Sequence, residues 1–436
     1  MNDIRQVWLT LSSLVALGAG CAVTPIKIVN GGVPVGGAEV YANGVLMGRT
    51  ANNGLLYVSQ VAPGTTLVAR QQLFERPGYR GNHGPENGGR GWTERVYITS
   101  MDVNDDGTLA TYTVTAPTVE QNLSLKNTNT LIGLHFLASL DWDASQAELD
   151  DLTNRVSQSS NYMYNASDGQ IYFEQVEIVD DGVFWGDAEY DWTADINLWP
   201  HTNGLAGLFG RNWFGLQNTA FMSRRTDGLN DFVVIDHEFG HLAYGLQDEY
   251  AGVWVPPSGN FCASKLKSGD PVFGNGGPKA SCVMTDQWNA GKYCSGHADD
   301  PHRNLTWQPG PCWDTLVAGL QDNQNPARWS LRTPTTRNAI PGMLPAIATQ
   351  WQTRINVTNN RQPNLCAAFP INLTRSDNGQ PMVNQNVVLV LPSRGINLNE
   401  GPTDAAGNIT IVGAHIGDQL QFNGSWTVPS SCTTTQ

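Results

Sequence analysis

HEFGHLAYGLQDEY, residues 237–250, is the stretch that decides the central fold of this 436-residue chain. It opens with the pattern HExxH, in which two histidines four positions apart lie on one face of a helix, because a turn takes 3.6 residues. His237 and His241 can therefore reach one metal ion, and Glu238 can lie beside a metal-bound water as general base. The pattern predicts a zinc-binding helix.

A catalytic zinc needs a third protein ligand, and Asp248 is the first candidate. On a continuous helix Asp248 would lie about 10 Å along the axis from His241, too far to share one metal ion. The chain must therefore turn back between them. Gly245 can end the helix, because glycine adopts the left-handed conformation at little cost. Asn230 or Asp231 is a good N-cap for the start of the helix.

HEFGH followed by GLQDEY resembles the M64 family of metallopeptidases, which includes bacterial IgA peptidases, and the metalloprotease domain of calcium-activated chloride channel regulators. Both are similar to the metzincins, and the resemblance implies a metzincin-like zincin domain over residues 125–345. The metzincin string HExxHxxGxxH is not matched, since Tyr244 and Gln247 occupy the positions of its glycine and third histidine. In the resembling families an aspartate at the position of Asp248 is the third ligand, and Glu249 is the alternative here.

Metzincins place a methionine turn beneath the zinc, and the resemblance implies that Ser281-Cys282-Val283-Met284 is this turn, with Met284 as its methionine. The alternative is a core methionine beside a structural cysteine. A tyrosine often assists catalysis in related enzymes. Tyr250 and Tyr293 are the candidates for that auxiliary role, and Tyr250 is equally a candidate packing residue.

The motif and the resemblance together predict a zinc endopeptidase, a hydrolase that cleaves extracellular proteins. One zinc ion, held by His237, His241 and Asp248, would lower the pKa of a bound water and polarise the peptide carbonyl. Glu238 would take the proton from that water and pass it to the leaving amine. The alternative is an adhesin-like binding lipoprotein that uses the same domain as a scaffold. The complete HExxH pattern favours the enzyme.

The overall charge narrows the expected partners. The chain has 25 Lys and Arg against 39 Asp and Glu, a formal net charge of −14. This argues against nucleic acid, whose phosphates select a basic surface, so we expect a protein or peptide substrate. Asp102 to Gly107 resembles the start of a Ca²⁺ loop, but its twelfth position is Thr113 instead of a bidentate glutamate, and a polar turn is the alternative. The oligomeric state stays open.

Residues 1–21 predict an export segment. Arg5 supplies a positive charge, and Val7 to Ala19 is apolar but too short to span a bilayer. Small residues before Cys21 resemble the lipoprotein processing pattern, in which Cys21 would carry lipid and tether the protein to a membrane. We expect an exported bacterial protein, either a lipoprotein of the outer membrane or cell surface or a secreted protein.

The cysteine count agrees with export. Setting Cys21 aside leaves six of the seven cysteines, an even number as expected in an oxidising compartment. The spacings are too wide for zinc knuckles of the CxxC type, so disulfides are favoured. Six cysteines allow fifteen pairings, which the sequence does not distinguish. Pairing of nearest neighbours would join Cys262 to Cys282, Cys294 to Cys312, and Cys366 to Cys432.

The whole chain predicts an α+β multidomain protein. Residues 25–117 and 360–436 predict two small β-sandwich domains, similar to immunoglobulin-like modules of the carboxypeptidase regulatory type. The zinc peptidase domain lies between them. Its pattern predicts a strand over Thr130–Leu140, a helix over Ser145–Ser157 and a strand over Ile171–Val179.

The two flanking regions share a local pattern. The turn Thr50-Ala51-Asn52-Asn53-Gly54 parallels Thr403-Asp404-Ala405-Ala406-Gly407, and a strand-like stretch follows each turn. We interpret this as a weak internal repeat, with convergent hairpin chemistry as the alternative. Phe74 to Trp92, rich in glycine and polar residues, predicts a surface loop.

Overall fold

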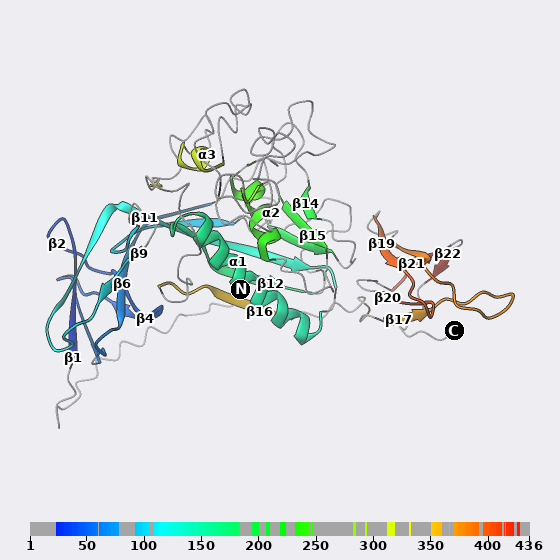
Figure 1. The fold of residues 1–436 in the computed structure, drawn as a ribbon, viewed down its shortest axis with the longest axis horizontal. Coiled ribbons are helices and arrows are strands. Elements are labelled where there is room, and N and C mark those ends of the chain that lie inside the picture. Colours follow the sequence, from blue (N-terminus) through cyan, green and yellow to red (C-terminus); the bar gives the residue numbers. More distant parts are fainter. Residues whose placement is uncertain are drawn as a thin grey trace, which may run out of the picture.

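The chain folds into an α+β structure in which strands predominate (Figure 1). Its largest apolar cores lie in an N-terminal, a central and a C-terminal part. The computed structural model describes residues 23–59, 61–77, 92–103, 109–142, 144–180, 182, 194–199, 206–209, 219–223, 232–244, 246, 282–284, 293, 312–318, 331–332, 350–359, 366, 369–391, 396–411, 414, 416–422 and 425–427.

The central sheet is built on β11 (Gln121–Leu140). Along one edge β11 pairs in parallel with β12 (Ile171–Val179), which pairs in parallel with β16 (Arg354–Thr358). Along the other edge it pairs in parallel with β13 (Ile196–Trp199), which leads to β15 (Thr219–Ser223) and β14 (Ala206–Phe209). β14 runs antiparallel to β15 and ends this path of strands. β11 and β12 contain the strands predicted for residues 130–140 and 171–179.

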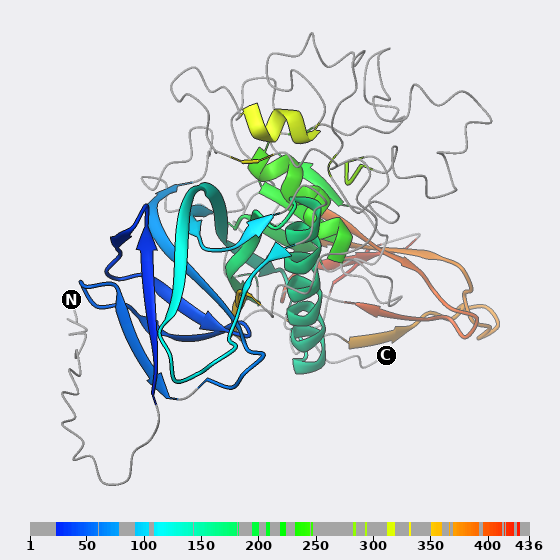
Figure 2. The same cartoon turned by 60° about the vertical axis from the view of Figure 1, so that its left-hand side comes forward.

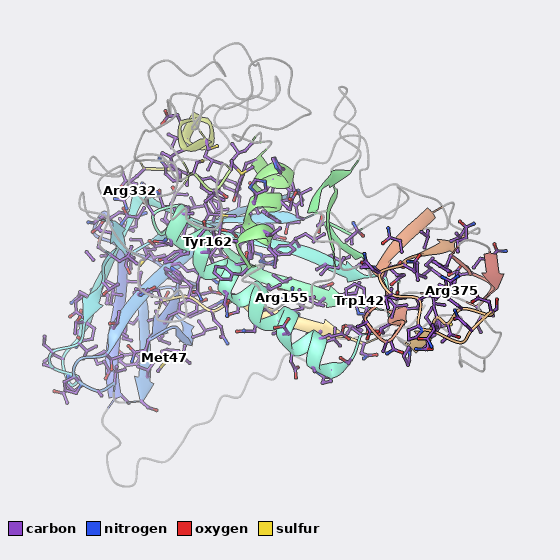
Figure 3. All side chains as sticks on the ribbon, turned by 45° about the vertical axis from the view of Figure 1, so that its right-hand side comes forward. Met47, Trp142, Arg155, Tyr162, Arg332 and Arg375 are labelled. Carbon is purple, nitrogen blue, oxygen red and sulfur yellow. The ribbon has the colours of Figure 1, made fainter. Side chains whose placement is uncertain are left out.

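Two helices, α1 (Gln146–Ala166) and α2 (Phe232–Tyr244), pack against each other and share the central core with one face of the sheet (Figure 2). α1 begins where the sequence predicts and continues beyond the predicted end. The Ser145 side chain caps the first turn of α1. The Glu148 carboxylate in turn accepts a hydrogen bond from the backbone N–H of Ser145. Tyr162 of α1 meets Phe232 of α2 edge-on, with ring centroids 5.8 Å apart (Figure 3). A third, short helix is α3 (Cys312–Ala318).

The N-terminal module, residues 23–114, surrounds its own apolar core, which includes Ile28, Val40 and Leu67. It is not separate from the central sheet, because β1 pairs in parallel and β7 in antiparallel with β11. Backbone hydrogen bonds therefore run continuously from the module into the central sheet. Its strands are β1 (Val23–Asn30), β2 (Val33–Pro34), β3 (Glu39–Ala42), β4 (Val45–Arg49), β5 (Leu55–Ser59), β6 (Thr66–Pro77), β7 (Thr93–Thr99), β8 (Asp102–Val103), β9 (Leu109–Ala110) and β10 (Tyr112–Thr113).

The prediction of a surface loop over residues 74–92 is wrong at both ends of that range. Phe74 to Pro77 belong to β6, and Trp92, directly before β7, is fully buried. Both ends belong to a hairpin that pairs with distant strands, and such pairing leaves no signal in local composition. Residues 78–91 lie outside the described residues.

The C-terminal module, residues 366–427, has a separate apolar core that includes Val387, Leu389 and Ile411. Met47 and Arg375 mark the N-terminal and C-terminal modules in Figure 3. The strands of the C-terminal module are β17 (Phe369–Asn372), β18 (Asn386–Leu391), β19 (Ile396–Pro402), β20 (Asn408–Ile411), β21 (Gln419–Gln421) and β22 (Ser425–Thr427).

The two modules contain the same buried threonine with the same hydrogen bonds. Each threonine follows the β4 or β19 strand, and its side-chain oxygen both donates to one backbone carbonyl and accepts from one backbone N–H. Thr50 donates to Val35 and accepts from Ala38, whereas Thr403 donates to Met382 and accepts from Gln385. The two threonines are the first residues of the turns that the sequence comparison aligned.

The glycines that end these turns are equivalent as well. The carbonyl of Gly54 accepts from the N–H of Ile28, and the carbonyl of Gly407 accepts from the N–H of Leu373. Both glycines have a left-handed φ, 76° and 80°. A Cβ on either one would collide with the backbone carbonyl of that same partner. Only glycine fits this combination of φ and close approach.

Even an irregularity of strand pairing recurs. The hairpins β3–β4 and β18–β19 each contain a bulge at the same relative position, one residue before a glycine on the second strand. In the first hairpin Met47 is the extra residue between the pairs Tyr41↔Leu46 and Val40↔Gly48. In the second hairpin Glu400 is the extra residue between the pairs Val388↔Asn399 and Val387↔Gly401. Convergent turn chemistry would not reproduce pairing register over several strands, so we infer that the modules are two copies of one unit.

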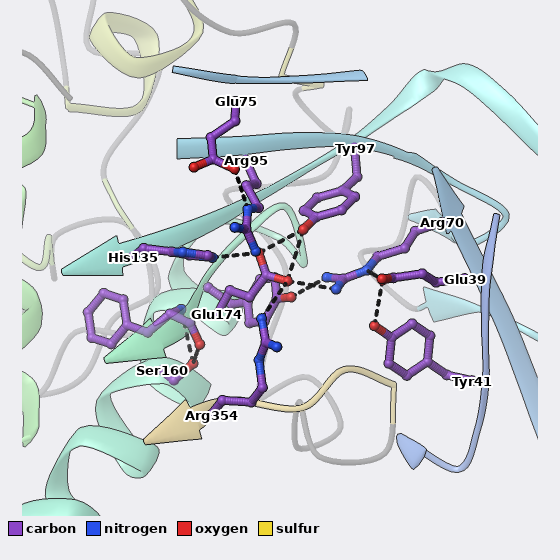
Figure 4. Close-up of polar contacts among 12 residues, drawn as sticks. Glu39, Tyr41, Arg70, Glu75, Arg95, Tyr97, His135, Ser160, Glu174 and Arg354 are labelled. Atoms are coloured by element: carbon purple, nitrogen blue, oxygen red, sulfur yellow. Dashed lines mark hydrogen bonds and ion pairs between the residues drawn. The ribbon is translucent and has the colours of Figure 1, made fainter. Parts of the chain in front are cut away.

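On the sheet face opposite the helices, a polar network joins the N-terminal module to the central sheet (Figure 4). Glu174 of β12 accepts hydrogen bonds from Arg70 of β6 at 2.6 Å and from Tyr97 of β7 at 2.8 Å, and contacts His135 of β11 at 3.0 Å. Burial alone would raise the pKa of Glu174, but the His135 hydrogen bond and the Arg70 charge lower it to about 2. Gly133 leaves room for this carboxylate, since a Cβ there would collide with it.

Candidate metal centre

The predicted zinc-binding helix is α2. It begins at Phe232, directly after the two candidate caps Asn230 and Asp231, which lie outside the described residues, and every residue from Val233 to Tyr244 is buried. Phe239 lies on the side of the helix that packs into the central core, with its ring 4.9 Å from that of Phe136 and 5.2 Å from that of Phe173. The helix face that carries Phe239 therefore packs against the sheet, and the two histidines lie on the opposite face of α2.

The imidazoles of His237 and His241 converge. Their ring centroids are 4.8 Å apart, their planes are perpendicular, and their two Nε2 atoms are 3.2 Å apart. Two nitrogens bound to one tetrahedral zinc at about 2.0–2.1 Å each lie about 3.3–3.4 Å apart. The separation of the two Nε2 atoms therefore matches one edge of a zinc coordination tetrahedron.

Backbone carbonyls orient both rings. Nδ1 of His237 lies 2.9 Å from the carbonyl oxygen of Val283, and Nδ1 of His241 lies 2.6 Å from that of Leu246. A carbonyl oxygen only accepts, so each Nδ1 carries the hydrogen and each neutral ring presents its lone pair at Nε2. Two lone pairs that face each other at this distance repel, and a metal ion or a proton between them removes the repulsion. The tautomers and directions are those of a histidine pair that binds metal.

The carbonyl groups of Val283 and Leu246, which orient the two histidines, were missed by the sequence analysis. Any residue type can supply a backbone carbonyl, so no side-chain pattern marks these positions. The N–H of Leu246 also donates to the carbonyl of Gly240 at 3.3 Å, so the chain has turned back onto the end of α2. α2 therefore ends at Tyr244, directly before the predicted stop Gly245, and the predicted return of the chain to Asp248 stays a prediction. Asp248 and Glu249, the two candidates for the third ligand, lie outside the described residues.

Met284 packs directly against α2. The segment Cys282–Met284 is buried, and its Val283 carbonyl is the one that orients His237. A Cβ on Gly240 would lie 2.8 Å from the Met284 sulfur, so the side chain of Met284 packs against the bare backbone of α2. Gly240 thus permits the close approach between the turn and the helix.

Of the two candidate auxiliary tyrosines, Tyr293 lies in the central core. The hydroxyl of Tyr293 donates to the sulfur of Met163 at 3.6 Å, and its ring meets that of Tyr244 edge-on. Tyr293 is 1% exposed, and burial raises the pKa of its hydroxyl well above the ordinary value. This placement in the core favours a packing role for Tyr293. Tyr250 lies outside the described residues.

A buried acid next to the first histidine joins the two helices. Asp236 is fully buried, and its carboxylate accepts a hydrogen bond from the Ser159 hydroxyl of α1 at 2.8 Å. Burial raises the pKa of Asp236 well above its ordinary value, against the opposing effect of the Ser159 hydrogen bond. The sequence analysis missed Asp236. An acid within the otherwise apolar run FVVID was the available signal.

The cysteines are described only in part. Cys282 and Cys312 are buried in the central core, and Cys366 is disulfide-bonded. The predicted partners Cys262, Cys294 and Cys432 lie outside the described residues, as does Cys21. The pairing by nearest neighbours and the lipidation of Cys21 stay predictions.

No group of three or more His, Cys, Asp or Glu side chains gathers to hold a metal ion within the described ranges. In the candidate Ca²⁺ loop, the carboxylate of Asp102 bonds to Lys126 and Asn129, while residues 104–108 lie outside the description. None of the described helices combines the length and the apolar character needed to cross a bilayer.

Comparison with known proteins adds no assignment. No protein-family model, no curated protein and no solved structure matches this chain.

Proposed function

We propose that this protein is a zinc-dependent endopeptidase with a metzincin-like catalytic domain of the M64 type. The observation that carries the proposal is the pair of histidines on α2. Their Nε2 atoms converge at 3.2 Å, and both Nδ1 atoms are held by backbone carbonyls. A structural histidine pair on a helix has no need of convergent lone pairs, whereas a metal site requires them.

The proposed zinc ligands are His237, His241 and Asp248, with Glu249 as the alternative to Asp248. Bound zinc would supply Lewis acidity, which polarises a peptide carbonyl and lowers the pKa of water. Glu238 directly follows the first ligand on α2 and is only 4% exposed. In that position its carboxylate would accept the proton of the attacking water and return it to the leaving amine.

The edge of the central sheet supports an extended peptide as substrate. β14 pairs with β15 and is the last strand on this side of the described sheet, and α2 packs against both strands. An edge strand offers unpaired backbone N–H and C=O groups, which can bind a peptide as an additional strand. A peptide bound there would lie next to the helix that carries the histidines.

We further propose that the protein acts outside the cytoplasm on extracellular proteins, either tethered through lipid on Cys21 or secreted. The two flanking modules support this, since β-sandwich modules are common in surface proteins. They also fit the alternative function, an adhesin-like binding lipoprotein with a zincin scaffold. One Ca²⁺ ion near Asp102 is a second, weaker proposal for a cofactor.

A paired measurement of zinc content and peptide cleavage tests the proposed function. The protein without residues 1–21 is purified, its zinc is quantified, and it is incubated with a diverse peptide library. Glu238→Ala should keep zinc and lose cleavage, because the glutamate is not a ligand. Glu75→Ala, which removes a surface carboxylate from β6, should change neither. Chelators should abolish cleavage by the unchanged protein.

Three results would contradict the proposal. Cleavage that survives in Glu238→Ala would remove the proposed general base. Zinc bound without any cleavage of the library would instead favour the binding protein. Absence of bound zinc after exposure to stoichiometric zinc would contradict both the zinc endopeptidase and the binding protein with a zincin scaffold.

A further inference from the structure

The two copies of the flanking module differ by one large insertion. In the C-terminal copy, β21 pairs with β22 across a short turn, with Leu420 opposite Trp426. In the N-terminal copy the equivalent pair is Leu67 of β6 and Tyr112 of β10, and the hairpin β6–β7 lies between them in sequence. The C-terminal copy has an apolar core of its own with no such hairpin among its described strands. The module fold therefore does not depend on the hairpin.

The inserted hairpin belongs to the central sheet by its contacts. β6 and β7 pair with each other from Arg70 and Thr99 to Pro77 and Thr93. β7 also pairs with β11 as far as His135, and β13 takes over the same edge of β11 at Ala138. The hairpin thus occupies one edge of β11 up to His135, and β13, which leads to β15 and β14, continues along the same edge.

Trp92 stands at the end of the hairpin that is nearest to β13. Its backbone N–H donates to Oδ1 of Asp195 at 3.0 Å, and Oδ2 of Asp195 accepts from the N–H of Leu137 at 2.8 Å. Asp195 therefore fixes the position of Trp92 relative to β11. The side chain is fully buried and belongs to the central core instead of the core of the N-terminal module.

The ring of Trp92 reaches the zinc-binding helix. It packs against Phe239 with centroids 6.1 Å apart at an interplanar angle of 67°. Phe239 lies between the two histidines in sequence and on the opposite side of α2. A shift of Phe239 would therefore rotate or displace both histidines together.

We propose that the β6–β7 hairpin is an extension of the N-terminal module that belongs to the catalytic unit, and that Trp92 is a positioning residue for the metal site. Trp92 acts through Phe239 to set the orientation of α2 and thereby the directions of His237 and His241. This inference rests on the proposed metal site. Loss of a residue that orients metal ligands weakens metal binding by about 10- to 100-fold.

Metal binding by the full chain without residues 1–21 tests this inference without any substrate. Cobalt(II) replaces zinc as probe, because its visible spectrum reports ligand geometry, and zinc affinity is measured by competition with a chromophoric chelator. The variants are Trp92→Ala, Trp92→Phe and the control Trp351→Ala. Trp351 is equally buried, but it packs against Tyr41 and bonds to Tyr164 instead of touching α2.

We expect Trp92→Ala to alter the cobalt spectrum and to weaken zinc binding at least 10-fold, while Trp92→Phe, which keeps a ring against Phe239, restores both. Trp351→Ala should lose stability and keep the cobalt spectrum and the zinc affinity. If Trp92→Ala does not fold, Trp92→Leu takes its place with the same expectation. An unchanged spectrum and affinity in the Trp92 variant, or equal changes in the Trp351 control, would overturn the inference. Failure of the unchanged protein to bind cobalt would instead overturn the proposed metal site.

Discussion

Replacement of Glu174 by glutamine removes the charge at the centre of the network that joins the N-terminal module to the central sheet. Glu174 is 2% exposed at its side chain and pairs with Arg70, whose side chain is 6% exposed. The difference between a pKa of about 4.5 in the unfolded chain and about 2 in the folded chain corresponds to roughly 3 kcal/mol. Removal of one partner from a buried ion pair typically costs about 3–5 kcal/mol. We therefore expect Glu174→Gln to lose about 3 kcal/mol of unfolding free energy at neutral pH.

The pH dependence follows from the direction of the pKa change. Because folding lowers the pKa of Glu174, the stabilisation is complete above about pH 4.5 and is lost as the pH falls towards about 2. Urea denaturation at about pH 7, 5 and 3, followed by circular dichroism, should show the difference between the two proteins shrinking to roughly half at the lowest pH.

A surface pair provides the control for this experiment. Glu75 bonds to Arg95 at 2.6 Å, but their side chains are 40% and 27% exposed. Glu75→Gln should therefore change stability by less than about 1 kcal/mol. Equal effects of Glu174→Gln and Glu75→Gln, or a difference that persists undiminished at about pH 3, would refute the assignment of this stabilisation to the buried charge.

Two glycine substitutions test close approaches, one in α2 at the proposed metal site and one in the C-terminal module. Gly240→Ala should lower the unfolding free energy measured in urea by about 1–2 kcal/mol, because the Met284 sulfur occupies the space of the new methyl group. The cost of this overpacking outweighs the gain in helix propensity. A more stable variant would contradict this packing. Gly407→Ala should lower the melting transition more than Gly379→Ala, since both have a left-handed φ but only Gly407 would meet the Leu373 carbonyl. Equal losses would show that backbone strain alone matters there.

Local signals predicted the two helices of the central core, α1 and α2. The spacing of His237 and His241 placed both on one helix face, and the structure adds that their nitrogens converge. The helix predicted over Ser145–Ser157 begins at the predicted position, and the structure adds the capping box of Ser145 and Glu148, whose residues lie three positions apart. Gly54 and its partner turn marked the repeat. Each of these features is decided by residues within one turn of helix or one hairpin, so sequence spacing contains the information.

The features that escaped the sequence analysis depend on contacts between distant segments. Trp92 follows a polar, glycine-rich run, and nothing in that run indicates that β7 will pair with β11. The orientation of His237 depends on a backbone carbonyl at Val283, which any residue could supply. Glu174 gave a usable signal, since it interrupts the apolar strand IYFEQVEIV. Read together with Gly133 on the neighbouring strand, it would have indicated a buried carboxylate with its own space.

The duplicated module makes one of these distant contacts interpretable. A single β-module beside the central domain would give no means of separating the contacts that its own fold needs from the contacts that the central domain needs. The second copy supplies that comparison, because it reproduces the buried threonine, the turn glycine and the strand bulge with no counterpart of β7 among its described strands. The residues that the copies share maintain the module. The hairpin that the described part of the C-terminal copy lacks brings Trp92 to Phe239, so the unit around α2 that we propose to be catalytic begins inside the N-terminal module instead of after it.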